Sequence, residues 1–186
     1  METVVTGDRT VPESGTYDID AAASTVRFRM SAFFGLLPVR GDFAVAGGRI
    51  TVSDSLPAST VDVSLRADTF ASGVARRDAH VKSADYLDAA TYPDITFTSG
   101  GLSVPPAGLA TLPGELTVRG VTRPVTVTVD AVDVTDGRLT VRASATVDRY
   151  AFGVTAAKGM TGRRLKMLIA VRADLRPAGR DRAHTV

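Results

Sequence analysis

One histidine in the middle of the chain lies between carboxylates at a spacing that could support general acid–base chemistry. His80 follows Asp78 by two residues and precedes Asp85 by five. An imidazole that is oriented by a carboxylate is a common general base. No Gly-x-Ser-x-Gly turn or other nucleophile accompanies it, so the pattern favours a structural hydrogen-bonding role for His80. We therefore predict no catalytic residue and a protein that is not an enzyme.

The remaining residue types exclude several kinds of site. The 186 residues contain no Cys and two His, which rules out a disulfide framework, Cys-ligated zinc, an iron–sulfur cluster, a thiol nucleophile and a multi-histidine metal site. Asp18 and Asp20 alternate with Ile19 and are expected on an exposed strand face rather than across a cleft, as a glycosidase would require. We expect no metal and no cofactor.

Two groups of basic residues could meet an anion. Arg76 and Arg77 could contact an anionic head group, because the guanidinium fork matches phosphate. Alternatively they form ion pairs with Asp78 or Asp85 that hold the segment in place. The run 163–166 could make transient contact with an anionic membrane surface, or it could be a solvated strand end.

Overall charge and hydropathy limit the partners. The net charge is +2 and aromatic residues make up 6% of the chain, which does not indicate a nucleic-acid binder. No apolar stretch reaches the roughly 18 residues of a spanning helix. Residues 1–15 lack the basic and apolar parts of an export signal, so we expect a cytoplasmic protein.

Alternation of apolar and polar residues dominates the rest of the chain and predicts strands. The alternating segments are residues 26–30, 39–45, 61–65, 95–97, 116–118, 125–129, 139–147 and 165–171. Turns are predicted at Gly47-Gly48, Gly100-Gly101, Pro105-Pro106, Arg119-Gly120 and Asp136-Gly137. One or two short helical turns are expected between residues 71 and 90. This pattern predicts an antiparallel all-β fold, either a sandwich or a closed barrel.

The interior of such a barrel has two possible states. Eight strands leave a lumen that is either filled by side chains or wide enough for one small ligand. Composition alone favours the filled state, because protein interiors normally reach crystal-like packing density.

Four ordered motifs resemble those of the YceI-like family of lipid-binding barrels. They are Tyr17–Asp20 with Val39–Phe43, Arg77–Asp88 followed by Tyr92–Ser99, Gly114–Val125, and Tyr150–Val154, which is similar to a late Arg-x-x-Phe-Gly segment. The resemblance spans about residues 16–175. It implies an extended eight-stranded antiparallel barrel, similar to a lipocalin, around a long apolar channel that carries a polyisoprenoid or similar amphiphile. Members often carry histidines where this chain has Ala23 and Ala32, which removes polar groups near one end of the channel.

We accordingly expect a barrel over residues 15–176, with mobile tails at 1–14 and 177–186. Its function would be to sequester or transport a polyisoprenoid or comparable long-chain lipid. Strand parity and the apolar segment 31–38 give the expected lining: Phe28, Met30, Phe33, Phe34, Phe43, Val63, Leu65, Phe97, Leu116, Val127, Val141, Met167 and Ile169. Arg76, Arg77 and His80 are the expected head-group contacts.

Two alternatives from other classes stay open. One is a small-molecule stress or redox enzyme that acts on a quinone-like ligand with His80. The other is a packed structural barrel that binds a partner through Phe33-Phe34 or the tails. Even-stranded barrels with an exposed apolar lip often pair, so a homodimer is also considered.

Overall fold

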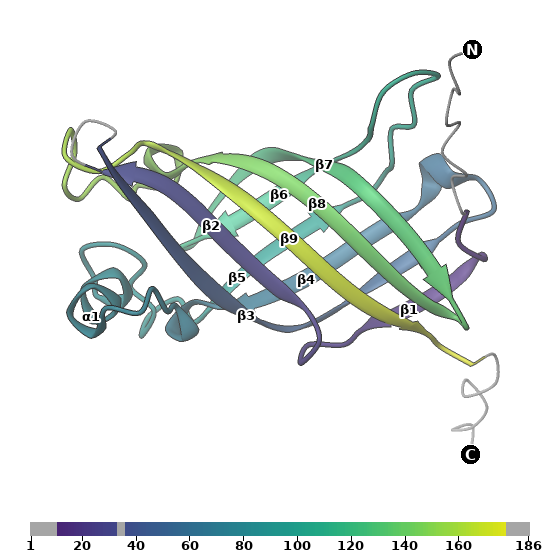
Figure 1. Cartoon of the computed structure of the whole chain (residues 1–186), viewed down its shortest axis with the longest axis horizontal. Coiled ribbons are helices and arrows are strands. Elements are labelled where there is room, and N and C mark those ends of the chain that lie inside the picture. The colour runs from purple at the N-terminus through teal and green to yellow at the C-terminus, as the bar shows by residue number, and fades with distance from the viewer. Residues whose placement is uncertain (1–10, 33–35, 178–186) are drawn as a thin grey trace, which may run out of the picture.

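The computed structural model describes residues 11–32 and 36–177, which form an antiparallel β-barrel. Figure 1 shows long, strongly tilted strands that wrap around the longest axis of the molecule. The strands are β1 (Gly15–Ile19), β2 (Thr25–Ala32), β3 (Leu37–Val52), β4 (Thr60–Arg66), β5 (Asp94–Ser99), β6 (Ala110–Val118), β7 (Val121–Thr135), β8 (Arg138–Asp148) and β9 (Arg164–Leu175). Helix α1 (Ala75–Lys82) and 3₁₀ turns at Leu56–Ala58, Ala67–Thr69 and Arg149–Phe152 complete the described part.

Nine strands fill eight positions around the barrel. The order runs from β2 through β9, β8, β7, β6, β5 and β4 to β3, and the pairing of β3 with β2 closes the ring. Strand β1 pairs with the same two neighbours as β2, because Asp18 lies opposite both Arg49 of β3 and Asp174 of β9. β1 and β2 therefore share one position and are separated by a turn that Asp20 stabilises by accepting hydrogen bonds from the backbone of residues 22 and 23. The predicted eight-stranded antiparallel barrel is confirmed.

Two of the predicted hairpin turns show the backbone conformation that their sequences require. Arg119 and Gly120 have φ angles of 52° and 71°, and Asp136 and Gly137 have φ angles of 52° and 74°. Positive φ at both central residues is the signature of the type I′ turn, whose twist matches that of the flanking strands. Both turns are confirmed, and α1 confirms the predicted helical segment between residues 71 and 90.

The turn predicted at Gly47-Gly48 is wrong, because both residues lie inside β3. The pairing with β4 shifts between Val45 and Gly47, which marks a β-bulge. A Cβ atom at position 48 would lie 2.3 Å from the carbonyl oxygen of Asp62 and 2.8 Å from the Cα atom of Val63. The glycine is needed because the two strands approach closely at this bulge rather than because the chain reverses.

The barrel has two dissimilar ends (Figure 1). One end, here called the α1 end, carries α1, the end of β2, the start of β3, the β6–β7 hairpin and the β8–β9 loop. The opposite end carries the β3–β4 and β5–β6 loops, the β7–β8 hairpin and the start of β1. None of the described helices is long and apolar enough to cross a lipid bilayer.

The expected tails fall largely at residues 1–10 and 178–186, which lie outside the described residues. Residues 11–14 contact the barrel, since the hydroxyl of the fully buried Tyr17 donates a 2.9 Å hydrogen bond to the carbonyl oxygen of Glu13.

Candidate functional site

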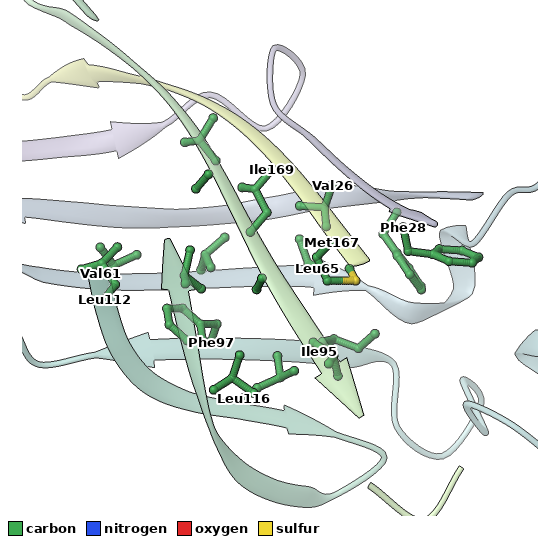
Figure 2. A pocket seen from close by; sticks show the side chains of 18 of the residues that line it. Val26, Phe28, Val61, Leu65, Ile95, Phe97, Leu112, Leu116, Met167 and Ile169 are labelled. Carbon is green, nitrogen blue, oxygen red and sulfur yellow. The ribbon is translucent and has the colours of Figure 1, made fainter. Parts of the chain in front are cut away.

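An apolar cavity of about 560 Å³ lies inside the barrel. All eight strand positions contribute inward-facing side chains to its wall, and Figure 2 shows aliphatic and aromatic groups from several strands facing a common space. On β8 the inward residues in the middle of the strand are Ala143 and Ala145, which are 5% and 9% exposed. Because these side chains are small, they do not reach across the lumen, and space remains between the strands.

Eleven of the expected lining residues lie in the cavity wall: Phe28, Met30, Phe43, Val63, Leu65, Phe97, Leu116, Val127, Val141, Met167 and Ile169. Phe33 and Phe34 lie outside the described residues. Sequence reasoning left out several wall residues that share the inward parity, among them Val26, Val61, Ile95 and Leu112, which Figure 2 labels. The same alternation of apolar residues could have identified them.

Three phenylalanines form a cluster toward the α1 end of the cavity. The ring centroids of Phe28 and Phe43 are 6.2 Å apart, and each lies 5.4 Å from the centroid of Phe70. Gly41 makes room for this cluster, because a Cβ atom there would lie 2.5 Å from Cε1 of Phe28. All three rings line the cavity, so the cluster forms part of its wall.

Most of the polar wall residues, including both arginines, lie at the α1 end, where Arg77, His80, Tyr86, Arg149 and Thr161 border the cavity. Three more polar residues, Ser59, Thr96 and Asp130, border it elsewhere. The polar group of an amphiphilic ligand would find hydrogen-bonding partners at the α1 end. The rest of the ligand would contact apolar side chains along most of its length.

Arg76 and Arg77 of α1, which were expected to contact a head group, have different surroundings. Arg77 borders the cavity and donates from Nε to the hydroxyl of Ser72 over 2.7 Å and from Nη2 to its carbonyl oxygen over 3.2 Å. The carboxylate of Asp78 accepts a hydrogen bond from the backbone of Ser72 at 2.9 Å. Arg77 is therefore positioned by hydrogen bonds to Ser72 and not by the ion pair with Asp78 or Asp85 that the sequence suggested. Arg76 is exposed and does not border the cavity.

His80 has a carboxylate partner. Its Nε2 atom lies 3.4 Å from Oδ2 of Asp85, and the two side chains are 58% and 72% exposed. The imidazole also meets the ring of Tyr86 edge-on at a centroid distance of 5.0 Å. These contacts join α1 to the segment that follows it. Among the described residues, no group of three His, Cys, Asp or Glu side chains could hold a metal ion.

Arg149 is a buried cation that the sequence analysis did not single out. It is 5% exposed, and its guanidinium donates to the carbonyl oxygens of residues 154, 156, 161 and 162 and to the hydroxyl of Thr161. These contacts hold the β8–β9 loop (residues 149–163) over the α1 end. The Arg-x-x-Phe-Gly segment was the available signal, since Phe152 is buried and Gly153 has a φ of 76° in the same turn.

Asp148 fastens the base of the same loop. Its carboxylate accepts a 2.8 Å hydrogen bond from Nε of Arg163 and a 3.0 Å hydrogen bond from the backbone of Tyr150. The Arg163 hydrogen bond is the main reason that the pKa of Asp148 lies below its usual value of 3.8.

Comparison with known families gives a match over the whole barrel. The YceI-like domain matches residues 17–175. A UPF0312 protein from Pseudomonas putida strain GB-1 is 37% identical over 89 residues, which cover 47% of this chain and 46% of the relative. A UPF0312 protein from Vibrio vulnificus strain YJ016 is 30% identical over 116 residues, which cover 62% of this chain and 61% of the relative. The chain therefore matches about half the length of the Pseudomonas relatives and somewhat more of the Vibrio relatives.

Solved structures share the fold at low sequence identity. Burkholderia cenocepacia BcnA has a TM-score of 0.73 at 21% identity, over 83% of this chain and 99% of that one. A polyisoprenoid binding domain from Saccharophagus degradans has a TM-score of 0.67 at 16% identity, over 88% of this chain and all of that one.

Proposed function

Because the chain belongs to the YceI-like family and its barrel surrounds an apolar cavity, we propose that it binds a polyisoprenoid or similar long-chain amphiphile. The protein would sequester or carry this lipid without chemical change. The observation that carries the proposal is the cavity itself, together with the apolar character of its wall. The name of the Saccharophagus domain supports the same class of ligand.

The size and chemistry of the cavity suit one hydrocarbon chain. Its volume of about 560 Å³ lies within the range of roughly 300–1,000 Å³ that is typical of small-molecule sites. Each CH₂ group that leaves water for the cavity contributes about 0.8 kcal/mol, so a long chain gains affinity without directed hydrogen bonds. We propose that Phe97, Leu116, Met167 and Ile169 contact the middle of the chain, and that the other predicted lining residues in the wall extend this contact surface.

The head group of the amphiphile would lie at the α1 end, because most of the polar wall residues and both of its arginines lie there. Arg77 and His80 are the proposed contacts. Arg149 is less suited to this role, since its N–H groups already bind the β8–β9 loop.

The test is to identify what the purified protein carries. Native mass spectrometry of protein from its own host, before and after solvent extraction, should reveal a bound prenyl or long-chain lipid. Incubation of the delipidated protein with prenyl alcohols should restore a one-to-one complex. Repeated recovery of empty protein that takes up no prenyl alcohol would contradict the proposal.

The compartment and the oligomeric state stay predictions. Fractionation of host cells would test the expected cytoplasmic location, and sedimentation of the purified protein would test for a homodimer.

A further inference from the structure

The α1 end carries exposed apolar side chains at the start of β3 and in the adjoining β8–β9 loop. Leu36 is 80% exposed, Leu37 is 52% exposed and Met160 is 53% exposed. The β8–β9 loop is joined to the end of β2, because the backbone N–H of Gly162 donates a 2.7 Å hydrogen bond to the carbonyl oxygen of Ser31, and residues 32 and 161 form a β-bridge. Ala32 in turn lies opposite Leu37 of β3. In Figure 1 the β8–β9 loop, the end of β2 and the start of β3 lie together at this end. We refer to Leu36, Leu37 and Met160 as the apolar tip.

A row of cations crosses the outer surface of the barrel behind this tip. Arg29 of β2 lies directly opposite Arg40 of β3 on one side and Lys166 of β9 on the other. All three residues are exposed, and none has a carboxylate at ion-pair distance among the described residues. We refer to Arg29, Arg40 and Lys166 as the basic collar.

The basic collar costs stability in the isolated protein, since like charges directly opposite one another on neighbouring strands repel. In the next row of β2 the situation differs, because Arg27 forms a 3.0 Å ion pair with Asp42. An external anionic surface would remove the repulsion within the collar.

The spacing between tip and collar matches the polar layer of a lipid bilayer. Arg29 precedes Ala32, and Arg40 follows Leu37, by three residues, so the collar lies about 10 Å from Leu37 along the tilted strands, at about 3.3 Å per residue. Apolar groups of interfacial proteins enter the bilayer by about 5–10 Å. Lys and Arg residues at the level of the head groups are attracted to anionic lipids.

We propose that the α1 end docks on an anionic lipid bilayer, with the apolar tip inserted between the lipid head groups and the basic collar against their phosphates. A second copy of this chain is a poorer occupant, because it would bring two collars of like charge together. Docking would place the end of the cavity that Arg77 and His80 border at the membrane, and this consequence rests on the proposed function. The docking itself rests on the tip and the collar.

The opposite end provides a natural control. It also exposes apolar side chains, including Leu109 at 51% and Val104 at 39%, but the β5–β6 loop that carries them (residues 100–109) contains no charged residue. Exposed apolar side chains therefore occur at both ends of the barrel. The α1 end differs because the basic collar lies next to them.

Co-sedimentation of the full chain with phosphatidylcholine vesicles, with and without phosphatidylserine, tests the proposal. We expect binding that requires phosphatidylserine and weakens as salt rises, because salt screens exposed charges. Combined Arg29→Gln, Arg40→Gln and Lys166→Gln should weaken binding by at least about tenfold, since each basic residue near an anionic surface contributes to affinity. Leu37→Asp with Met160→Asp should also weaken it.

Matched variants separate docking from general charge and hydropathy. Arg49→Gln, Arg138→Gln and Arg172→Gln remove the same number of cations from the other half of the barrel and should leave binding unchanged. Leu109→Asp should also leave it unchanged.

Three outcomes would overturn the proposal: equal binding to neutral vesicles, an unaffected collar variant, or equal losses in the two triple variants. Self-association through the tip, seen as a dimer that Met160→Asp dissolves, would also overturn it. Mass spectrometry of bound lipid in the same variants distinguishes the two proposals. Collar variants that lose vesicle binding and retain lipid uptake support both, whereas vesicle binding by a protein that never takes up lipid supports docking alone.

Discussion

The Nη1 atom of Arg149 donates a 2.8 Å hydrogen bond to the carbonyl oxygen of Val154, so a buried cation is held by backbone rather than by a carboxylate. Several carbonyl oxygens of the β8–β9 loop together accept the hydrogen bonds that this guanidinium donates. The loop and the side chain consequently depend on each other, because either one alone would leave polar atoms buried without partners.

Replacing Arg149 should therefore release the β8–β9 loop. We expect Arg149→Met to lower the free energy of unfolding by about 3 kcal/mol, since buried carbonyl oxygens lose charged donors. Arg149→Lys should recover part of the loss, because an ammonium offers three donors to the same acceptors. Urea unfolding measures both values. Arg164→Met, at an exposed position on β9, is the control and should change stability by less than about 0.5 kcal/mol.

Gly47 and Gly48 offer a direct test of why β3 needs glycine at its bulge. Their φ angles are nearly equal, at 154° and 155°, but a Cβ atom at position 47 would meet nothing within 4 Å, whereas one at position 48 would lie 2.3 Å from the carbonyl oxygen of Asp62. Gly48→Ala should therefore destabilise the protein by about 1–3 kcal/mol more than Gly47→Ala, as overpacking does elsewhere. Thermal or urea unfolding of the two variants checks this. Equal losses would mean that backbone strain, rather than contact with β4, explains the pair.

This glycine pair also shows where the sequence was insufficient. Two adjacent glycines between alternating segments are typical of a turn, and only the distance to the neighbouring strand reveals a bulge. Strand parity worked better, because alternation depends on local geometry: Phe97 and Met167 were expected to face inward, and both border the cavity.

Two further properties depend on the assembled barrel and have no local pattern. The burial of Arg149 depends on carbonyl oxygens, which every residue carries, so the Arg-x-x-Phe-Gly segment could mark the residue but not show that it is buried. Whether the lumen is open depends on strand number and tilt as well as on wall residues such as Ala143 and Ala145, and composition alone favoured a filled core. The family resemblance, not the composition, indicated the cavity.

The lowered pKa of Asp148 predicts that the folded protein loses stability at low pH. Its folded-state pKa lies below 3.8, mainly because Arg163 donates a hydrogen bond to the carboxylate, so the stability it contributes is present above its unfolded pKa and is lost as pH falls through the folded value. We expect stability to be level from about pH 5 to 8 and to fall below about pH 4. Asp148→Asn should make this acid-dependent fall shallower.

Urea unfolding at a series of pH values measures the slope. Asp62→Asn is the control, because Asp62 is exposed and has no ion-pair partner among the described residues. It should keep the wild-type slope. If both variants have that slope, the ion pair of Asp148 with Arg163 does not contribute to the acid sensitivity.

Filling the cavity should block long ligands without unfolding the barrel. Val141 faces the cavity from the middle of β8, whereas its neighbour Thr140 lies opposite Arg172 on the other face of the sheet. In Val141→Trp the indole would occupy cavity volume that now is empty, so we expect near-wild-type stability, retained binding of short prenyl alcohols and at least about a tenfold loss for long ones, since a shortened channel buries fewer CH₂ groups. Thr140→Trp adds the same ring outside and should bind both lengths normally. Native mass spectrometry of delipidated protein with each alcohol provides the comparison, and undiminished uptake of the long alcohol by Val141→Trp would place its binding site elsewhere.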